Sequence, residues 1–286
     1  MDHLFSGLTR KRADELSLLL TSEGIAHTKK NRQGIFSIEI EESLLSEAQG
    51  LVALFDMENR HQEPQTVWRL TPSWSGLFAS LAIFAVFLKT GPLQGYEPAV
   101  RLFAASSSRI LSGELFRTVT ALFLHSGWPH LLGNMAGLII FATGVFQISG
   151  DGVGWLLLLA ASILANWVNA LWFVGMGHIA FGASTLVFAA AGLLASAGTI
   201  RRLVYGGVNW RAFLPLGAGI SILTLSGVGP GSDVTGHLLG FAFGALFGII
   251  PGALPRKPGP KIQMVGLLTS AILCSAAFLV GGRGVF

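Results

Sequence analysis

Seven long apolar segments constrain the fold of this chain more than any other feature of its sequence. They cover residues 74–90, 118–143, 153–174, 183–199, 211–228, 233–252 and 262–281. Each is close to the ~20 residues that an α-helix needs to cross the hydrocarbon core of a bilayer. Only 12% of the 286 residues are charged, against roughly a quarter in an ordinary soluble domain. The pattern predicts an all-α, multi-pass membrane protein with seven transmembrane helices.

The first 66 residues differ from the rest of the chain in their charge. They carry seven Lys or Arg against eleven Asp or Glu, whereas residues 67–286 carry twelve against four. Thr9 is placed to cap a helix with apolar side chains at helical spacing, and Ser43 precedes a second stretch of this type. Between these helices, residues 25–30 and 34–41 predict two short strands, and the second alternates apolar with polar side chains. We therefore expect a small N-terminal α/β domain with an adapter or regulatory role.

The distribution of positive charge predicts the orientation in the membrane. With a cytoplasmic N-terminus, the cytoplasmic segments hold fourteen of the nineteen Lys and Arg residues, and the opposite side holds five. Positive residues favour the cytoplasmic side of membrane proteins. The first twelve residues also lack the pattern of a secretory signal. We expect the N-terminus in the cytoplasm and the C-terminus on the other side.

Composition and spacing disfavour several classes of function. The single cysteine, Cys274, cannot form an internal disulfide, and no Cys/His cluster has the spacing of a structural zinc site. The basic residues after position 66 lie between apolar runs rather than on one amphipathic face, which argues against nucleic-acid binding. No Asp or Glu lies inside the apolar segments away from their ends, so a proton-coupled small-solute transporter is disfavoured.

A few polar side chains interrupt the apolar segments and are candidates for function, because a polar group in hydrocarbon is costly unless it has a partner. Ser184 lies where a loop enters the fourth segment, two residues after Gly182. Its hydroxyl is placed to attack a carbonyl group while free amides of the first helical turn hold the oxyanion. The alternative is a serine that only caps the helix.

His237 is the second candidate, and it lies in a segment with glycine at every fourth position. These glycines allow the backbone of another helix to approach closely, and they are Gly236, Gly240, Gly244 and Gly248. The fourth segment offers small residues for such packing, which would bring Ser184 and His237 together as nucleophile and general base. The alternative is a buried histidine that binds a backbone carbonyl.

His130 and Asn134 form the third element. Their i, i+4 spacing places both side chains on one helix face, where both can donate to a developing oxyanion. Hydrogen bonding between membrane helices is the alternative role of such residues.

The ordered set of motifs resembles the rhomboid family of intramembrane serine proteases over about residues 74–252. The motifs are Gly113-Glu-Leu-Phe-Arg117-Thr-Val-Thr120, His130-x-x-x-Asn134, Gly182-Ala-Ser184-Thr and Gly236-His237-x-x-Gly240-x-x-x-Gly244. The resemblance implies a Ser184–His237 dyad in a water-filled cavity, with His130 and Asn134 at the oxyanion site. It also implies that residues 91–117 form a membrane-embedded loop, and that Phe188 stacks on His237.

The resemblance implies a division into three parts. We expect a cytoplasmic α/β domain over residues 1–66, with a linker at 61–73, a six-helix rhomboid-like core over 67–254, and a seventh helix with the C-terminus over 255–286. The expected location is the inner (plasma) membrane of a bacterium.

The expected activity is a serine endopeptidase that cleaves membrane proteins at or near their transmembrane segments. Asp233, one turn before His237, is the acid nearest in sequence to that histidine, but a dyad is favoured over a triad. No metal or cofactor is required, since the nucleophile is a hydroxyl and the oxyanion donors are amides and side chains. Two alternatives remain open: a non-proteolytic rhomboid-like protein that binds transmembrane segments for quality control, and a transporter.

Overall fold

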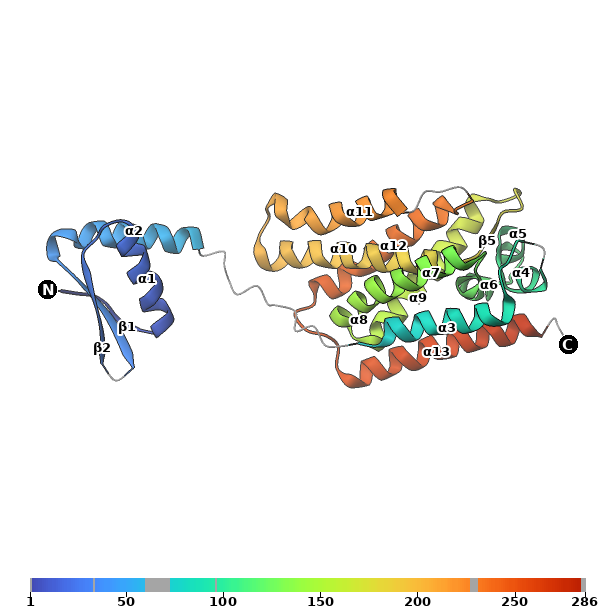
Figure 1. Ribbon diagram of the computed structural model, residues 1–286, viewed down its shortest axis with the longest axis horizontal. Helices are drawn as coiled ribbons and strands as arrows, with labels where there is room; N and C mark the ends of the chain where they lie inside the picture. The colour runs from blue at the N-terminus through green and yellow to red at the C-terminus, as the bar shows by residue number, and fades with distance from the viewer. Residues whose placement is uncertain (1, 33, 60–72, 96, 227–230, 284–286) are drawn as a thin grey trace. The chain divides into compact units, whose positions relative to one another are not determined.

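The computed structural model describes residues 2–32, 34–59, 73–95, 97–226 and 231–283. The chain divides into two compact units, Met1–Gln65 and Thr66–Phe286, which are drawn in Figure 1 and are described here one at a time. We call the second the membrane unit. The predicted linker at 61–73 lies outside the described residues, except for Ser73.

The first unit is a three-stranded antiparallel sheet with two helices. Its elements are β1 (Asp2–Leu8), α1 (Arg10–Ser22), β2 (His27–Arg32), β3 (Ile35–Ile40), the short 3₁₀ turn η1 (Glu42–Leu44) and α2 (Leu45–Asn59), and the strand order is β1-β3-β2. Thr9 caps α1 by accepting the N–H of Arg12. The α/β prediction is confirmed, but the sequence analysis missed β1. This strand pairs with β3 through two register shifts, and its sequence, Asp2-His-Leu-Phe-Ser-Gly-Leu8, does not alternate polar with apolar residues.

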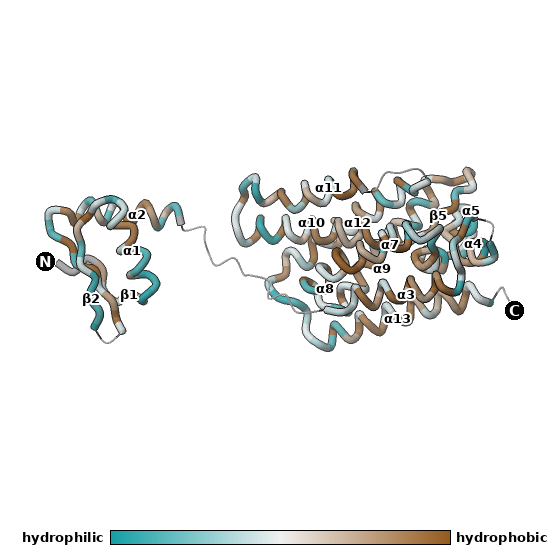
Figure 2. Tube along the Cα trace, viewed as in Figure 1, coloured by the Kyte–Doolittle hydropathy of each residue, from teal (hydrophilic) through white to brown (hydrophobic). Residues whose placement is uncertain are grey.

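The membrane unit is mainly helical. Its helices are α3 (Ser75–Thr90), α4 (Pro98–Phe103), α5 (Ser107–Leu111), α6 (Arg117–Thr120), α7 (Trp128–Gly137), α8 (Thr143–Ser149), α9 (Asp151–Trp172), α10 (Ser184–Gly206), α11 (Leu214–Ser226), α12 (Val234–Ala253) and α13 (Pro260–Gly282). A π-helical stretch, η3 (Leu138–Ala142), joins α7 to α8 without a break, and two 3₁₀ turns are η2 (Ala121–Phe123) and η4 (Trp210–Phe213). Figure 2 shows mainly hydrophobic residues along these helices.

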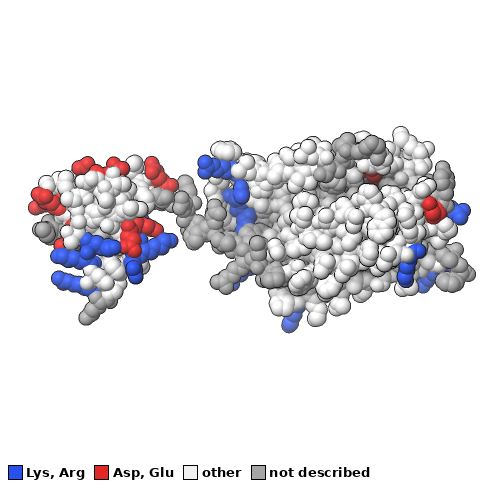
Figure 3. Space-filling view, in the orientation of Figure 1, with Lys and Arg blue, Asp and Glu red and all other residues white. Residues whose placement is uncertain are grey.

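Five of the described helices are long and apolar enough to cross a membrane, and they are Trp128–Ser149, Asp151–Trp172, Ser184–Gly206, Val234–Ala253 and Pro260–Gly282. Two shorter apolar helices, Ser75–Thr90 and Trp210–Leu225, correspond to the first and fifth predicted segments. Charged residues are sparse over the face of the membrane unit seen in Figure 3, and most lie near its two ends. The chain is therefore a multi-pass membrane protein.

The second predicted segment, 118–143, has the wrong boundaries. The membrane helix begins ten residues later, at Trp128, and continues to Ser149. The preceding apolar residues form short helical turns and the loop that follows them. Three of these residues, Val119, Leu122 and Leu124, are at most 5% exposed. Hydropathy alone does not separate a buried apolar turn from a lipid-facing helix, which explains the error.

The described residues of the loop between α3 and α7 are tied to the loop that precedes α10. Arg117 is 1% exposed, and its guanidinium donates to the carbonyl oxygens of Arg101 and Ala104. Strand β4 (Ala105–Ser106) pairs antiparallel with β5 (Ile179–Ala180). The loop thereby holds the backbone that leads directly into α10.

The seventh apolar helix, α13, is attached to the turn between α8 and α9 by one side chain. The Gln263 amide nitrogen donates to the carbonyl oxygen of Ser149 (2.8 Å), and its amide oxygen accepts the N–H of Val153 (3.0 Å). A side-chain carbon at Gly152 would overlap the carbonyl oxygen of Gln263. The glycine therefore permits the close approach of α13 to α9.

Candidate active site

Ser184 is the first residue of α10, the most buried of the five long helices. Ala183 is the N-cap residue, and no side chain caps this helix end. Ser184 is therefore not used as a capping residue. Two residues earlier, Gly182 adopts φ +142°, and a side-chain carbon there would lie 2.6 Å from Cε1 of His130. The glycine lets the backbone pass directly beside the imidazole of His130.

His237 lies in the first turn of α12 and faces Ser184. Its Nε2 is 2.8 Å from Oγ of Ser184, and the residue is 7% exposed. The ring of Phe188 lies against the imidazole, with 4.7 Å between the ring centroids and a tilt of 36°. The structure thus brings together two polar side chains that are 53 residues apart in sequence, in the geometry of a nucleophile and its general base.

The glycines of α12 allow this contact, because they let α12 lie directly against the backbone of α10. A side-chain carbon at Gly240 would lie 2.6 Å from the carbonyl oxygen of Thr185. One at Gly244 would overlap the carbonyl oxygen of Ala189. Gly248 makes an equally close approach one turn further along. The predicted packing is confirmed for these three glycines, whereas Gly236 lies next to Asp233 and Asn169 of α9 rather than α10.

Replacing Gly244 by Ala is expected to destabilise the membrane unit, because the added methyl group meets backbone rather than a movable side chain. Such overpacking costs about 1–3 kcal/mol. Thermal unfolding in detergent measures the effect. The matched control is Gly217→Ala in α11, where an added carbon meets nothing within 4 Å. Equal melting temperatures for the two variants would contradict the tight α10–α12 contact.

His130 and Asn134 lie on α7, beside the start of α10. The Nδ1 of His130 is 3.0 Å from Oγ of Ser126, and the other side of its ring faces Gly182. Asn134 is 6% exposed, and its amide nitrogen has no hydrogen-bond partner among the described residues. A buried donor without a partner is costly, so this amide is available for a group that binds from outside the chain.

His125 is a further site residue, to which the sequence analysis assigned no role. It is fully buried, and its Nε2 accepts the N–H of Ala183, the residue before Ser184, at 3.5 Å. Burial, with a contribution from nearby His130, lowers the pKa of His125 to about 4, so the ring is neutral at pH 7 and able to accept. Sequence analysis could have identified His125 as a site residue from its spacing with His130 and Asn134.

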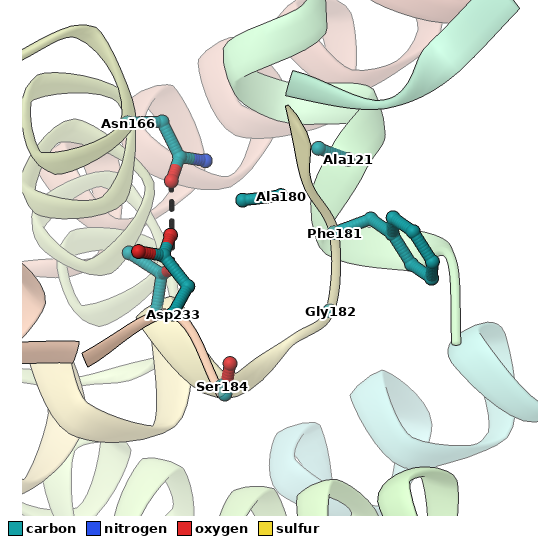
Figure 4. A pocket seen from close by; sticks show the side chains of 8 residues that line it. Ala121, Asn166, Ala180, Phe181, Gly182, Ser184 and Asp233 are labelled. Carbon is teal, nitrogen blue, oxygen red and sulfur yellow. Dashed lines mark hydrogen bonds between the residues drawn. The ribbon is translucent and has the colours of Figure 1, made fainter. Parts of the chain in front are cut away.

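A small polar cavity of ≈ 10 Å³ lies beside Ser184, which is about the room that one water molecule needs. Figure 4 shows Asn166, Ser184 and Asp233 around it. The hydroxyl of Thr185 donates to Asn166 at 3.4 Å. Among the described residues, no group of three His, Cys, Asp or Glu side chains is arranged to hold a metal ion.

Comparisons with known proteins agree with this architecture. The family model of the rhomboid domain matches residues 112–253, which include Ser184 and His237. The chain is also 29% identical over 207 residues to the Rhomboid protease GluP of Bacillus subtilis (strain 168). That alignment covers 70% of this chain but 38% of the Bacillus protein, so the chain spans well under half of its relative. With its helical membrane unit and small N-terminal α/β unit, this chain is a member of the rhomboid family.

Proposed function

We propose that this protein is an intramembrane serine endopeptidase with Ser184 as nucleophile and His237 as general base. The observation that carries the proposal is the 2.8 Å contact between Nε2 of His237 and Oγ of Ser184. A serine hydroxyl is a weak nucleophile until a base takes its proton. The name of the Bacillus relative, a rhomboid protease, agrees with this chemistry.

The reaction follows from the roles of the two side chains. Oγ of Ser184 attacks the carbonyl carbon of a peptide bond while His237 takes the hydroxyl proton, and His237 then gives this proton to the leaving amine. A water molecule next loses a proton to His237 and attacks the acyl-serine ester. As the bond between the acyl carbon and Oγ of Ser184 breaks, His237 returns this proton to Oγ, which releases the new carboxyl group and restores the hydroxyl. Neither half of the reaction needs a metal or an organic cofactor.

His130 and Asn134 are proposed to stabilise the oxyanion that forms in each half-reaction. The unpartnered amide nitrogen of Asn134 supports this role, since a preorganised donor is most useful when it has no other partner to give up. The closeness of His130 to Gly182 supports it as well, because a side-chain carbon at the same glycine would also lie 3.5 Å from Oγ of Ser184.

The proposed substrates are membrane proteins with a transmembrane segment. Ser184 and His237 lie in the first turns of two membrane-spanning helices, so they reach peptide bonds close to one face of the bilayer. A substrate held in the same bilayer can present such a bond. We also propose the division into a 1–66 domain, a 67–254 core and a 255–286 extension.

A serine-reactive fluorophosphonate probe tests the proposed function in purified protein. We expect labelling of the wild-type protein and its loss in both Ser184→Ala and His237→Ala. Folded protein that shows no labelling would overturn the protease proposal and favour a rhomboid-like protein that only binds transmembrane segments. Labelling that persists in Ser184→Ala would show that another residue is the nucleophile.

The proposed orientation places the N-terminal unit and the α10–α11 loop in the cytoplasm of a bacterium, with the catalytic residues near the outer face of its inner membrane. Single cysteines in a Cys274→Ser background test it, at Lys30→Cys, Gly206→Cys and Met176→Cys. An impermeant thiol reagent added to whole cells should label position 176 and spare positions 30 and 206. Met176 is 73% exposed in the loop between α9 and α10. The reverse labelling pattern would show that the protein has the opposite orientation in the membrane.

A further inference from the structure

The helix that carries His237 begins with a capped first turn. Asp233 is the N-cap residue of α12, and its carboxylate accepts the N–H of Gly236 at 3.1 Å. Its main-chain oxygen accepts the N–H of His237 at 3.0 Å. The first turn of a helix has few hydrogen bonds of its own and frays most readily. The position of the His237 ring therefore depends on this cap.

Two other segments hold the carboxylate of Asp233 in place. The amide nitrogen of Asn169, near the end of α9, donates to Oδ2 of Asp233 at 2.7 Å. Nε2 of His178, in the loop between α9 and α10, lies 3.4 Å from Oδ1 of Asp233. His178 is itself stacked on Phe173, with ring centroids 4.1 Å apart. The cap of α12 is thus anchored to α9 and to the loop that leads to Ser184.

Gly236 provides the room that this arrangement needs. A side-chain carbon at this position would overlap Oδ2 of Asp233 and would lie 3.3 Å from the amide nitrogen of Asn169. The absence of a side chain before His237 is therefore explained by the neighbouring carboxylate of Asp233.

The cap also brings a negative charge close to the proposed base. Burial acts to raise the pKa of Asp233, but interactions with His178, with the Gly236 N–H and with the charge of His237 outweigh it and lower the pKa. The carboxylate is therefore ionised at neutral pH. A nearby negative charge stabilises the positive imidazole ring that forms when His237 takes a proton.

We infer that Asp233 is a positioning residue for His237: held by Asn169 and His178, it keeps the first turn of α12 closed and the imidazole aligned with Ser184. The closed first turn follows from the contacts alone, whereas the catalytic consequence rests on the proposed function. The two parts are tested by separate measurements.

Amide hydrogen exchange tests the closed first turn without any need for activity. In Asp233→Ala, exchange at the amides of Gly236 and His237 should be about 5- to 30-fold faster, the effect of losing a good helix cap. Asp233→Asn should exchange nearly as slowly as wild type, because asparagine caps as well as aspartate. Asn169 can then turn its side-chain oxygen, which has no partner among the described residues, toward the new amide. Unchanged exchange in Asp233→Ala would overturn the inference.

Cleavage kinetics test the consequence for catalysis. Asp233→Ala should lower kcat by roughly ten- to a hundred-fold with little change in KM. Asp233→Asn keeps the cap but not the negative charge, so it should restore only part of the loss. The matched control is Gly266→Ala in α13, where an added carbon would lie 2.6 Å from the carbonyl oxygen of Gly152. That site is 17 residues from Asn169 along α9, or about 25 Å. The control should lower the melting temperature but keep kcat at temperatures where the protein is folded.

The two measurements separate the possible failures. Equal kcat losses in Asp233→Ala and Gly266→Ala at equal loss of melting temperature would overturn the positioning role. A wild-type protein without Ser184-dependent cleavage, but with the expected exchange pattern, would overturn the proposed function and leave the closed first turn supported.

Discussion

Ser184→Ala is expected to lower the rate of peptide-bond cleavage by a factor on the order of 10⁶. The hydroxyl is the only group in this mechanism that forms a covalent bond with the substrate. The fold should be nearly unaffected, because Ser184 does not cap α10 and the loss of its hydrogen bond to His237 costs about 1 kcal/mol. Cleavage of a generic transmembrane substrate by purified protein in detergent measures the rate, and circular dichroism checks the fold.

His237→Ala should be as inactive as Ser184→Ala, and the double variant should be no slower than either. Nucleophile and base act as one unit, so their effects on the rate are far from additive. If the rate loss of the double variant equalled the product of the two single losses, the two side chains would instead contribute independently. Substantial cleavage by folded Ser184→Ala protein would remove Ser184 from the mechanism.

Asn134→Ala is expected to lower kcat by roughly 10²–10³ and to change substrate binding little, as does the loss of one oxyanion donor in a serine protease. A role in helix packing predicts a different result. An interhelical hydrogen bond in a membrane protein averages only about 0.6 kcal/mol, so its loss would slightly lower the melting temperature and leave kcat unchanged. Steady-state kinetics and thermal unfolding of the same preparations separate these two roles.

Ser80→Ala is the matched control for Asn134→Ala. The Ser80 hydroxyl donates to the carbonyl oxygen of Met135 at 3.0 Å, so its removal loosens α3 from α7 next to Asn134 without removing an oxyanion donor. His130→Ala should resemble Asn134→Ala, because both side chains lie on one face of α7. If Asn134→Ala and Ser80→Ala behaved alike, Asn134 would be a packing residue.

The parts of this fold that follow from periodicity could be predicted from the sequence. The apolar segments predict the membrane helices, and the glycines of α12 predict that another helix lies against their face. Gly240 and Gly244 confirm that prediction, since a side-chain carbon at either position would collide with the backbone of α10. Because Ser184 lies on α10 and His237 on α12, the contact between the two side chains could be predicted from the sequence.

Features that depend on long-range partners could not be predicted. The apolar residues before Trp128 look like part of a membrane helix, and only the surrounding protein shows them to be buried turns. The spacing of His125 with His130 and Asn134 marks it as a candidate, but its contact with the amide of Ala183, 58 residues later, cannot be read from local sequence. Gly236 fitted the helix-packing pattern, yet its neighbours are the carboxylate of Asp233, three residues earlier, and the amide of Asn169. Only the second neighbour, on α9, is distant in sequence.

The contact of Gln263 with the turn between α8 and α9 has a consequence for the order in which the molecule is assembled. Its amide supplies a donor to the end of α8 and an acceptor to the start of α9, two places where a helix cannot satisfy its own backbone. Gln263 belongs to α13, which follows all the other described helices in the sequence. During synthesis, α8 and α9 enter the membrane before this partner exists, so their turn first depends on water or lipid headgroups for hydrogen bonds. The turn reaches its final state only after α13 has been inserted, and insertion of the last helix therefore completes a structure that begins much earlier in the chain.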